Sequence, residues 1–175
     1  GYMALSPTVG RAGEAFEPVI GLSLGAKKWF IDTEELDHAE RLLLNFGHTF
    51  GHALEGASHY RLSHGVAVGV GILCSLDYSH AQHGHAFTGR ALELERHLCA
   101  LLAEVPDLAD ILRAIDVPEA LDRLKSDKKH EAEHYRFVTV DEHEQVQLVR
   151  IAKSSAQGDA LIAAAISRSV ARLSA

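Results

Sequence analysis

The sequence has little cysteine, few aromatic residues and no excess of positive charge. Its 175 residues include two cysteines, Cys74 and Cys99, which lie in apolar stretches without metal-site spacing, so we expect buried thiols in a reducing compartment. Lys and Arg number 17 against 24 Asp and Glu, and the net charge of −7 argues against a nucleic-acid partner. No apolar run is long enough to cross a membrane and no signal peptide is evident, so a cytoplasmic location is expected.

Motifs for nucleotide binding and for several enzyme classes are also missing. A dinucleotide-binding fold needs repeated units of strand, glycine-rich turn and helix, and the chain offers no such series. The glycines at 69–71 lack a preceding strand and a third glycine, so we do not expect them to contact a nucleotide. A Walker loop and a GxSxG nucleophile elbow are absent as well. These absences exclude the commonest routes to nucleotide and acyl-transfer chemistry.

The hydrophobic pattern predicts one mainly α-helical domain with a small β-hairpin. The apolar run 66–76 is hydrophobic on every side, which predicts a buried central helix. Two alternating segments, 135–140 and 145–151, flank DEHE and are typical of a hairpin. Neither an internal repeat nor a long linker divides residues 1–175. Six further segments have the apolar spacing of helices: 16–31, 41–57, 88–104, 107–115, 118–125 and 158–174.

Residues 44–65, LNFGHTFGHALEGASHYRLSHG, concentrate imidazoles on a short segment. A helical face against the core would carry aliphatic side chains, and one against water would carry Lys and Glu. Imidazoles with a carboxylate therefore predict a polar pocket, and His64 follows closely enough to fold back onto it. Four side chains share the helical face: His48, His52, Glu55 and His59.

Two glycines on the same predicted helix indicate a close approach. Gly47 and Gly51 are four residues apart, and a glycine inside a helix costs about 1 kcal/mol relative to alanine. We therefore expect another backbone or a ligand to lie against them. Ser63 is placed to cap the helix that follows.

The histidines allow more than one metal site. Neutral imidazole is a common zinc ligand, and His48 with His52, one turn apart, could chelate one ion. His48 with His64 is a second possible pair, which leaves His52 to contact a substrate. HTFGH lacks the glutamate of the HExxH motif, so a metalloprotease would have no general base. The alternative is that these histidines are hydrogen-bonded core residues. Three others, expected to be solvated in a turn-rich break over 80–89, are His80, His83 and His85.

At this point the segment resembles a known family. RLLLNFGHTFGHALE followed by SHGVAVGVG is similar to the signature of 3-dehydroquinate synthase and related sugar-phosphate cyclases. SLGAK (23–27) upstream and SDKKH (126–130) downstream resemble the family's substrate-binding segments, in the same order. The resemblance covers roughly residues 16–175. It implies the helical C-terminal metal- and substrate-binding domain of the dehydroquinate synthase-like fold.

The resemblance also implies roles for individual residues. His48 and His64 would bind Zn²⁺ or Co²⁺, and His52 would contact the substrate and its phosphate as a catalytic residue. Lys128 or Lys129 would reach the phosphate, and we favour Lys128 as the second catalytic residue. Anionic groups of a substrate call for Arg and Lys. The remaining implied contacts to hydroxyl, phosphate and carboxylate groups come from Asn45, Arg41 and Lys27.

The implied reaction is the NAD-assisted elimination of phosphate from a phosphorylated heptulosonate, with closure of a carbocycle, in the shikimate pathway to aromatic amino acids. A third zinc-ligating glutamate, a catalytic lysine and the N-terminal NAD-binding domain of the family have no counterpart in this sequence, and Asp37 and Val66 differ from the family's residues. We therefore expect that domain as a partner in cis or in trans, an inactive isolated chain, and homodimerisation through an apolar surface. The alternatives are the C-terminal domain of a metal-dependent polyol dehydrogenase and a non-catalytic helical module with a relic pocket.

Overall fold

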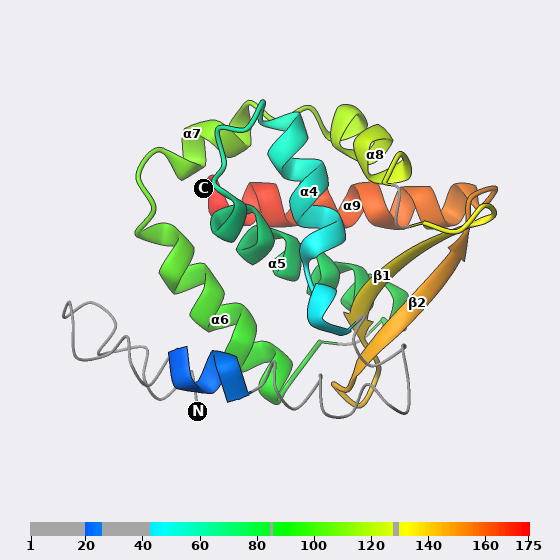
Figure 1. Cartoon of the computed structure of the whole chain (residues 1–175), viewed down its shortest axis with the longest axis horizontal. Coiled ribbons are helices and arrows are strands. Elements are labelled where there is room, and N and C mark those ends of the chain that lie inside the picture. The colour runs from blue at the N-terminus through cyan, green and yellow to red at the C-terminus, as the bar shows by residue number, and fades with distance from the viewer. Residues whose placement is uncertain (1–19, 26–42, 85, 128–129) are drawn as a thin grey trace. The chain divides into compact units, whose positions relative to one another are not determined.

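A computed structural model describes residues 20–25, 43–84, 86–127 and 130–175 (Figure 1). The chain comprises two compact units, residues 1–44 and 45–175. In the first unit, residues 20–25 are helical, within the helix predicted over 16–31. The rest of that predicted helix, 16–19 and 26–31, lies outside the described residues. The expectation of one domain over the whole chain stays a prediction.

The second unit is built mainly from helices, as the sequence pattern predicts. The strands β1 (His134–Val140) and β2 (Val146–Ala152) form the expected antiparallel hairpin. Mainly α architecture with one small hairpin is therefore confirmed. The 3₁₀-helix η1 (Leu43–Asn45) has its first two residues in the first unit and its last in the second. The helices that follow are α4 (His48–Ala57), α5 (His64–His83), α6 (Arg90–Ala103), α7 (Leu108–Arg113), α8 (Val117–Lys125) and α9 (Ala156–Leu173).

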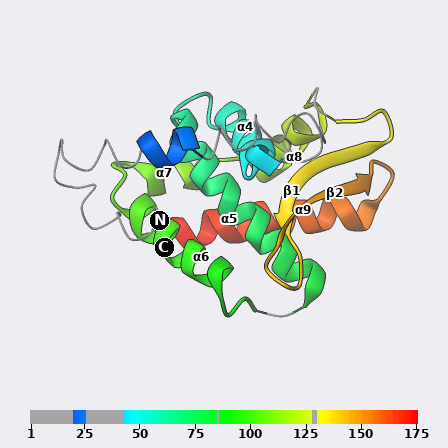
Figure 2. The same cartoon turned by 60° about the horizontal axis from the view of Figure 1, so that its bottom comes forward.

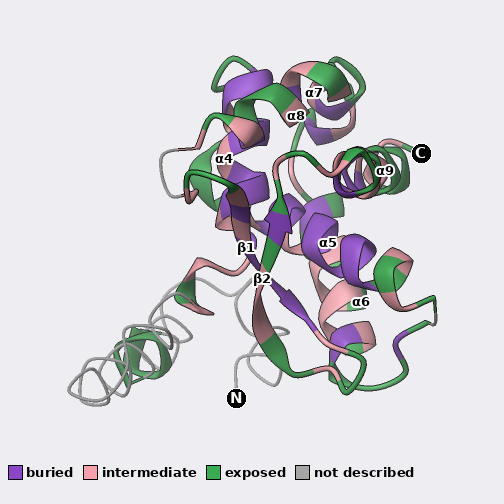
Figure 3. Cartoon of the chain, turned by 90° about the vertical axis from the view of Figure 1, so that its right-hand side faces the viewer, coloured by how far each residue is buried: buried purple, intermediate pink, exposed green. Residues whose placement is uncertain are grey.

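Helix α5 is the centre of this unit, which confirms the predicted buried helix. Helices α4, α6 and α9 and strand β1 all pack against it (Figure 1). Val70, Leu73 and Cys74 have no exposed surface. Buried residues line the inner faces of the surrounding elements in Figure 3, and Figure 2 shows the hairpin near the beginning of α9. None of the helices among the described residues is both long and apolar enough to cross a membrane.

Helices α4 and α5 meet backbone to backbone, which accounts for the glycine pair. A Cβ on Gly51 would lie 3.1 Å from the backbone nitrogen of Val68. Conversely, a Cβ on Gly71 would lie 2.6 Å from the amide nitrogen of Gly51 and would overlap the carbonyl of Gly47. The prediction of a close approach is confirmed, and its partner is the backbone of α5.

The predicted histidine helix over 41–57 is confirmed at its end, but it is wrong at its start and in placing His59 on its face. It was expected from residue 41, but α4 begins at His48, because Gly47 has a left-handed φ of 77° that no right-handed helix can include. The helix ends at Ala57, so His59 lies beyond it with a φ of 51° and leaves the shared face. Ser63 holds the N-cap position of α5, as predicted, but it accepts from the Ala67 amide through its backbone carbonyl, at 2.9 Å, and its side chain makes no capping hydrogen bond.

The turn-rich break predicted at 80–89 is also shorter than expected. Helix α5 continues through His83, and Gly84 ends it in a left-handed conformation with a φ of 74°. His80 and His83 are therefore helical rather than part of a loop, and His85 lies outside the described residues. The remaining predicted helices and both strands match the structure to within a few residues at their ends.

A partly buried ion pair connects α5 and α9. Asp77 of α5 accepts hydrogen bonds of 2.6 Å from the Ser169 hydroxyl and from the Arg172 guanidinium, both on α9. Cys74 nearby is a buried free thiol, as expected, and burial raises its pKa to about 12. Cys99 is half-buried, and burial raises its pKa as well.

The tip of the hairpin caps the beginning of α6. Glu144 extends its carboxylate to three backbone amides, with hydrogen bonds of 3.0 Å from Thr88, 2.8 Å from Gly89 and 3.0 Å from Ala91. These bonds, led by that from Ala91, lower the pKa of the Glu144 carboxyl. Glu144, more than fifty positions away in the chain, thus caps the N-terminus of α6, whose own N-cap residue is Gly89.

Candidate metal and substrate site

A short loop between α4 and α5 brings the candidate ligands together. Ser58 is buried, and its hydroxyl donates to the Glu55 carbonyl at 2.9 Å and accepts from the Leu62 amide at 3.3 Å. His59 and Tyr60 take positive φ values of 51° and 61°, which lets the chain reverse direction at once. As a result His64, the first residue of α5, faces the last turns of α4.

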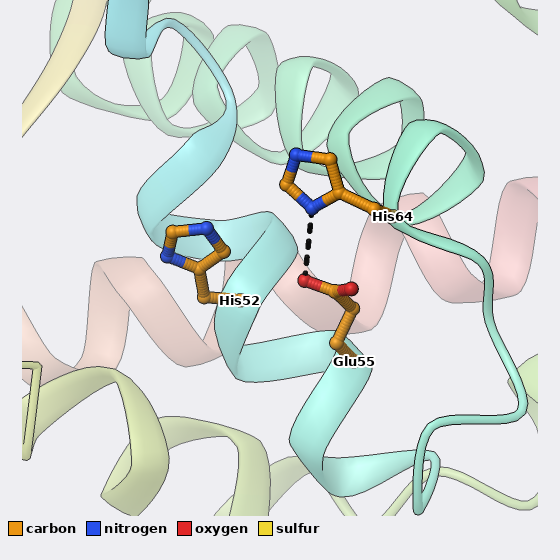
Figure 4. A group of neighbouring side chains, drawn as sticks. All are labelled: His52, Glu55 and His64. Atoms are coloured by element: carbon orange, nitrogen blue, oxygen red, sulfur yellow. Dashed lines mark hydrogen bonds and ion pairs between the residues drawn. The ribbon is translucent and has the colours of Figure 1, made fainter.

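Figure 4 shows the outcome of this geometry. His64 Nδ1 lies 3.2 Å from a carboxylate oxygen of Glu55, and His52 points toward the same place from one turn earlier. One nitrogen or oxygen from each of His52, Glu55 and His64 lies within 4.8 Å of the other two. Two imidazoles and a carboxylate are a donor set that zinc accepts.

These histidines are not core residues. The side chains of His52 and His64 are 38% and 58% exposed, whereas that of Glu55 is 17% exposed. A hydrogen-bonded core histidine would be closed off from solvent, so the structure does not support that alternative for these two. The cluster is open on one side to water or to a ligand.

His48 completes a group of three imidazoles. Its ring centroid lies 5.5 Å from that of His64 and 5.9 Å from that of His52, and the rings of His52 and His64 are 5.7 Å apart. Its Nδ1 lies 3.3 Å from the carbonyl oxygen of Phe46, a hydrogen bond of the kind that orients metal-binding histidines. The predicted pairing of His48 with His64 as metal ligands stays a prediction beside the His52, Glu55 and His64 group.

A groove of about 740 Å³ lies between α4 and α8, and His52 is one of its lining residues. The Nδ1 atom of His52 lies 3.8 Å from a carboxylate oxygen of Asp127 at the far wall. Arg123 is the one Lys or Arg among the described residues that line this groove, and it is held 2.9 Å from Glu119. The groove is lined by Thr49, His52, Ala53, Gly56, Tyr60, Glu119, Asp122, Arg123, Ser126 and Asp127.

Sequence reasoning missed most of this groove. Asp127 was named only as part of SDKKH, and Tyr60 was not singled out at all. Of the other predicted substrate-binding residues, Asn45 ends η1 just before α4. Four more lie outside the described residues, and their roles stay predictions: Lys27, Arg41, Lys128 and Lys129.

Comparison with known proteins identifies the family. Residues 4–130 match the family described as 3-dehydroquinate synthase C-terminal. The chain belongs to this family. The resemblance of its histidine segment to the family signature is thereby confirmed. The matched stretch includes α4, α5 and α8, which carry the histidine cluster and the groove.

Individual relatives agree with the family match. The chain is 34% identical over 137 residues to a 3-dehydroquinate synthase of Rhodopseudomonas palustris (strain BisB18), covering 75% of the chain and 36% of the relative. It is 32% identical over 130 residues to that of Salinibacter ruber, covering 74% and 34%. The enzyme of Geobacillus thermodenitrificans is 31% identical over 140 residues, covering 79% and 37%. The chain thus spans about a third of the length of the curated relatives it matches.

Proposed function

We propose that the chain supplies the zinc- and substrate-binding part of a 3-dehydroquinate synthase-like cyclase. The observation that carries this proposal is the convergence of His52, Glu55 and His64 beside an open groove. Family membership supports it, because the curated relatives that the chain matches are named 3-dehydroquinate synthase. The same names favour a cyclase over a polyol dehydrogenase.

The metal would be held by His64 together with Glu55 and either His52 or His48. His48, His52 and Glu55 come from α4 and His64 from the first turn of α5, so one ion would join the two helices. A bound Zn²⁺ would act as a Lewis acid on an oxygen of the substrate. His52, next to the groove, is the histidine best placed to contact a substrate if His48 takes the metal position.

The groove suits the hydroxyl-bearing part of a sugar-acid substrate. Its carboxylates, from Glu119, Asp122 and Asp127, accept hydrogen bonds from hydroxyl groups and repel phosphate. The phosphate and carboxylate ends of the substrate would need cations, and the roles that the family resemblance assigns to Lys27, Arg41, Lys128 and Lys129 stay predictions. The chain's contribution is to bind and orient the substrate at the metal.

NAD would be bound by the part of the enzyme that the longer relatives have in addition. The chain presents no glycine-rich phosphate turn in its sequence, and hydride transfer needs that cofactor. We accordingly expect the chain alone neither to bind NAD tightly nor to release phosphate from a heptulosonate phosphate. A NAD-binding domain supplied in cis or in trans would restore turnover, and homodimerisation stays an expectation.

Zinc titration of the chain against a chromophoric chelator tests the metal site. Replacing His64 by alanine should weaken binding by more than the roughly 10–100-fold that loss of an outer-shell partner costs. Glu55→Gln should do the same if the carboxylate is a ligand. The matched control is His143→Ala, because His143 is a 78% exposed histidine at the tip of the hairpin. Comparing His48→Ala with His52→Ala then shows which of the two is the other ligand.

Two outcomes would contradict the proposal. Equal zinc affinity for the wild type and the His64 variant would remove the metal site. The second outcome is a chain that folds but binds neither zinc nor inorganic phosphate. If adding a relative's NAD-binding domain did not restore this binding, the non-catalytic helical module would be favoured instead.

A further inference from the structure

His130 joins the end of α8 to the beginning of β1. Its Nε2 lies 2.7 Å from the carbonyl oxygen of Leu124, in the last turn of α8. Its Nδ1 accepts a hydrogen bond of 3.0 Å from the backbone amide of Arg136, in β1. The ring also packs on the buried Tyr135, with centroids 5.3 Å apart. One imidazole therefore bridges a helix and a strand through their backbones.

Only one protonation state of the ring makes both bonds. The amide of Arg136 is a donor, so Nδ1 must present its lone pair, and the carbonyl of Leu124 is an acceptor, so Nε2 must carry the proton. A second proton on Nδ1 would turn two N–H donors toward each other across 3.0 Å. The bridge consequently requires the neutral imidazole with its proton on Nε2.

The bridge is linked to the groove through backbone hydrogen bonds of Asp127. The amide of Asp127 donates to the Leu124 carbonyl at 3.1 Å, and the Asp127 carbonyl accepts from the His130 amide at 3.1 Å. The carboxylate of Asp127 then reaches to 3.8 Å from His52 Nδ1. We propose that His130 is a positioning residue whose neutral imidazole fixes Asp127 beside His52, and whose protonation loosens this end of the groove.

The surroundings of His130 set the direction of the pH effect. Burial lowers the pKa of His130, and the cations of Lys153 and Arg136 lower it further, whereas its bond to the Leu124 carbonyl and the carboxylate of Asp127 raise it. The net lowering keeps the ring neutral in neutral solution. The bridge therefore stabilises the folded chain fully above the ordinary histidine pKa. This stabilisation is lost as the pH falls through the lowered pKa that His130 has in the folded state.

The experiment is a pH titration of the full chain by NMR with two substitutions. Long-range proton–nitrogen spectra report the His130 tautomer, and the amide signals of Arg136 and Asp127 report the bridge. In the wild type both amides should shift together as His130 protonates. His130→Gln keeps a donor and an acceptor at similar spacing and does not titrate, so it should retain the neutral-pH signals and lose the transition. His130→Phe, which has neither group, should displace the Asp127 signal at every pH.

Each result decides the proposal. An Asp127 signal that ignores His130 protonation, or an equal transition in His130→Gln, would overturn it, and the glutamine variant keeps this test available if the phenylalanine variant fails to fold. The consequence for the metal rests on the proposed function. Zinc affinity at neutral pH should fall severalfold in His130→Phe, below the roughly 10–100-fold of a direct outer-shell loss, and recover in His130→Gln. Absence of zinc binding in the wild type would count against the metal site alone, because the NMR transition needs no metal.

Discussion

Replacing Gly71 by alanine tests whether the α4–α5 crossing holds the candidate ligands in place. A Cβ there would overlap the Gly47 carbonyl and lie 2.6 Å from the Gly51 nitrogen, and no change of rotamer can move these backbone atoms. The two helices must therefore separate. Overpacking costs about 1–3 kcal/mol and occasionally more, offset by about 1 kcal/mol of better helix propensity. Because the overlap is with backbone atoms, the cost should lie near the upper end, about 3 kcal/mol. We therefore expect a net loss of about 2 kcal/mol in the free energy of unfolding, and weaker zinc binding because His64 moves away from Glu55.

Gly69→Ala is the matched control, because it makes the same change two residues earlier in α5. There a Cβ would lie 3.4 Å from a methyl carbon of Leu102, an ordinary van der Waals distance. Its stability should stay the same or rise by about 1 kcal/mol. Urea unfolding followed by circular dichroism measures both variants, and chelator competition measures zinc. If Gly71→Ala unfolded at the same urea concentration as Gly69→Ala, the close crossing would not be the constraint that we infer.

Three further changes test the supports of the site. Glu144→Gln should lower the free energy of unfolding by about 1 kcal/mol at neutral pH, as loss of a helix cap does. The folded state lowers the pKa of Glu144, so this difference should disappear as the pH falls through that lowered pKa. Unfolding measured at a series of pH values tests this. Arg172→Met should cost about 3 kcal/mol in the same assay, since it leaves the 5% exposed Asp77 without its cation. Val70→Asp should prevent folding, whereas His52→Ala should leave the Tm nearly unchanged, and an equal loss in thermal unfolding would make His52 a structural residue.

The sequence predicted those features that depend on local spacing. A run that is apolar on all sides, such as 66–76, is stable only in the core. Alternating apolar and polar residues on both sides of DEHE are typical of a hairpin. The close approach at Gly51 was predictable because glycine is disfavoured inside a helix unless its missing side chain is needed. The family signature was readable for the same reason, since it lies within one continuous segment.

The features that failed depend on tertiary contacts or on single backbone angles. Helical spacing continues smoothly through Gly47 and His59, and only the positive φ of each shows that the helix does not include them. The groove was missed because its two walls, α4 and α8, are about sixty residues apart in the chain. The cap from Glu144 is equally remote from α6. None of these leaves a periodic signal in the sequence.

The placement of the candidate ligands links metal binding to the folding of the chain. Glu55 and His64 belong to different helices, so any contact that fixes α4 on α5 also fixes the distance between them. The reverse follows from linkage: zinc that binds only the folded chain stabilises the crossing, by about 2.7 kcal/mol at a hundredfold excess over Kd. That is close to the cost expected for Gly71→Ala. Zinc would therefore restore much of the stability of that variant, but with a weaker affinity, because part of its binding free energy would be used to bring the helices together.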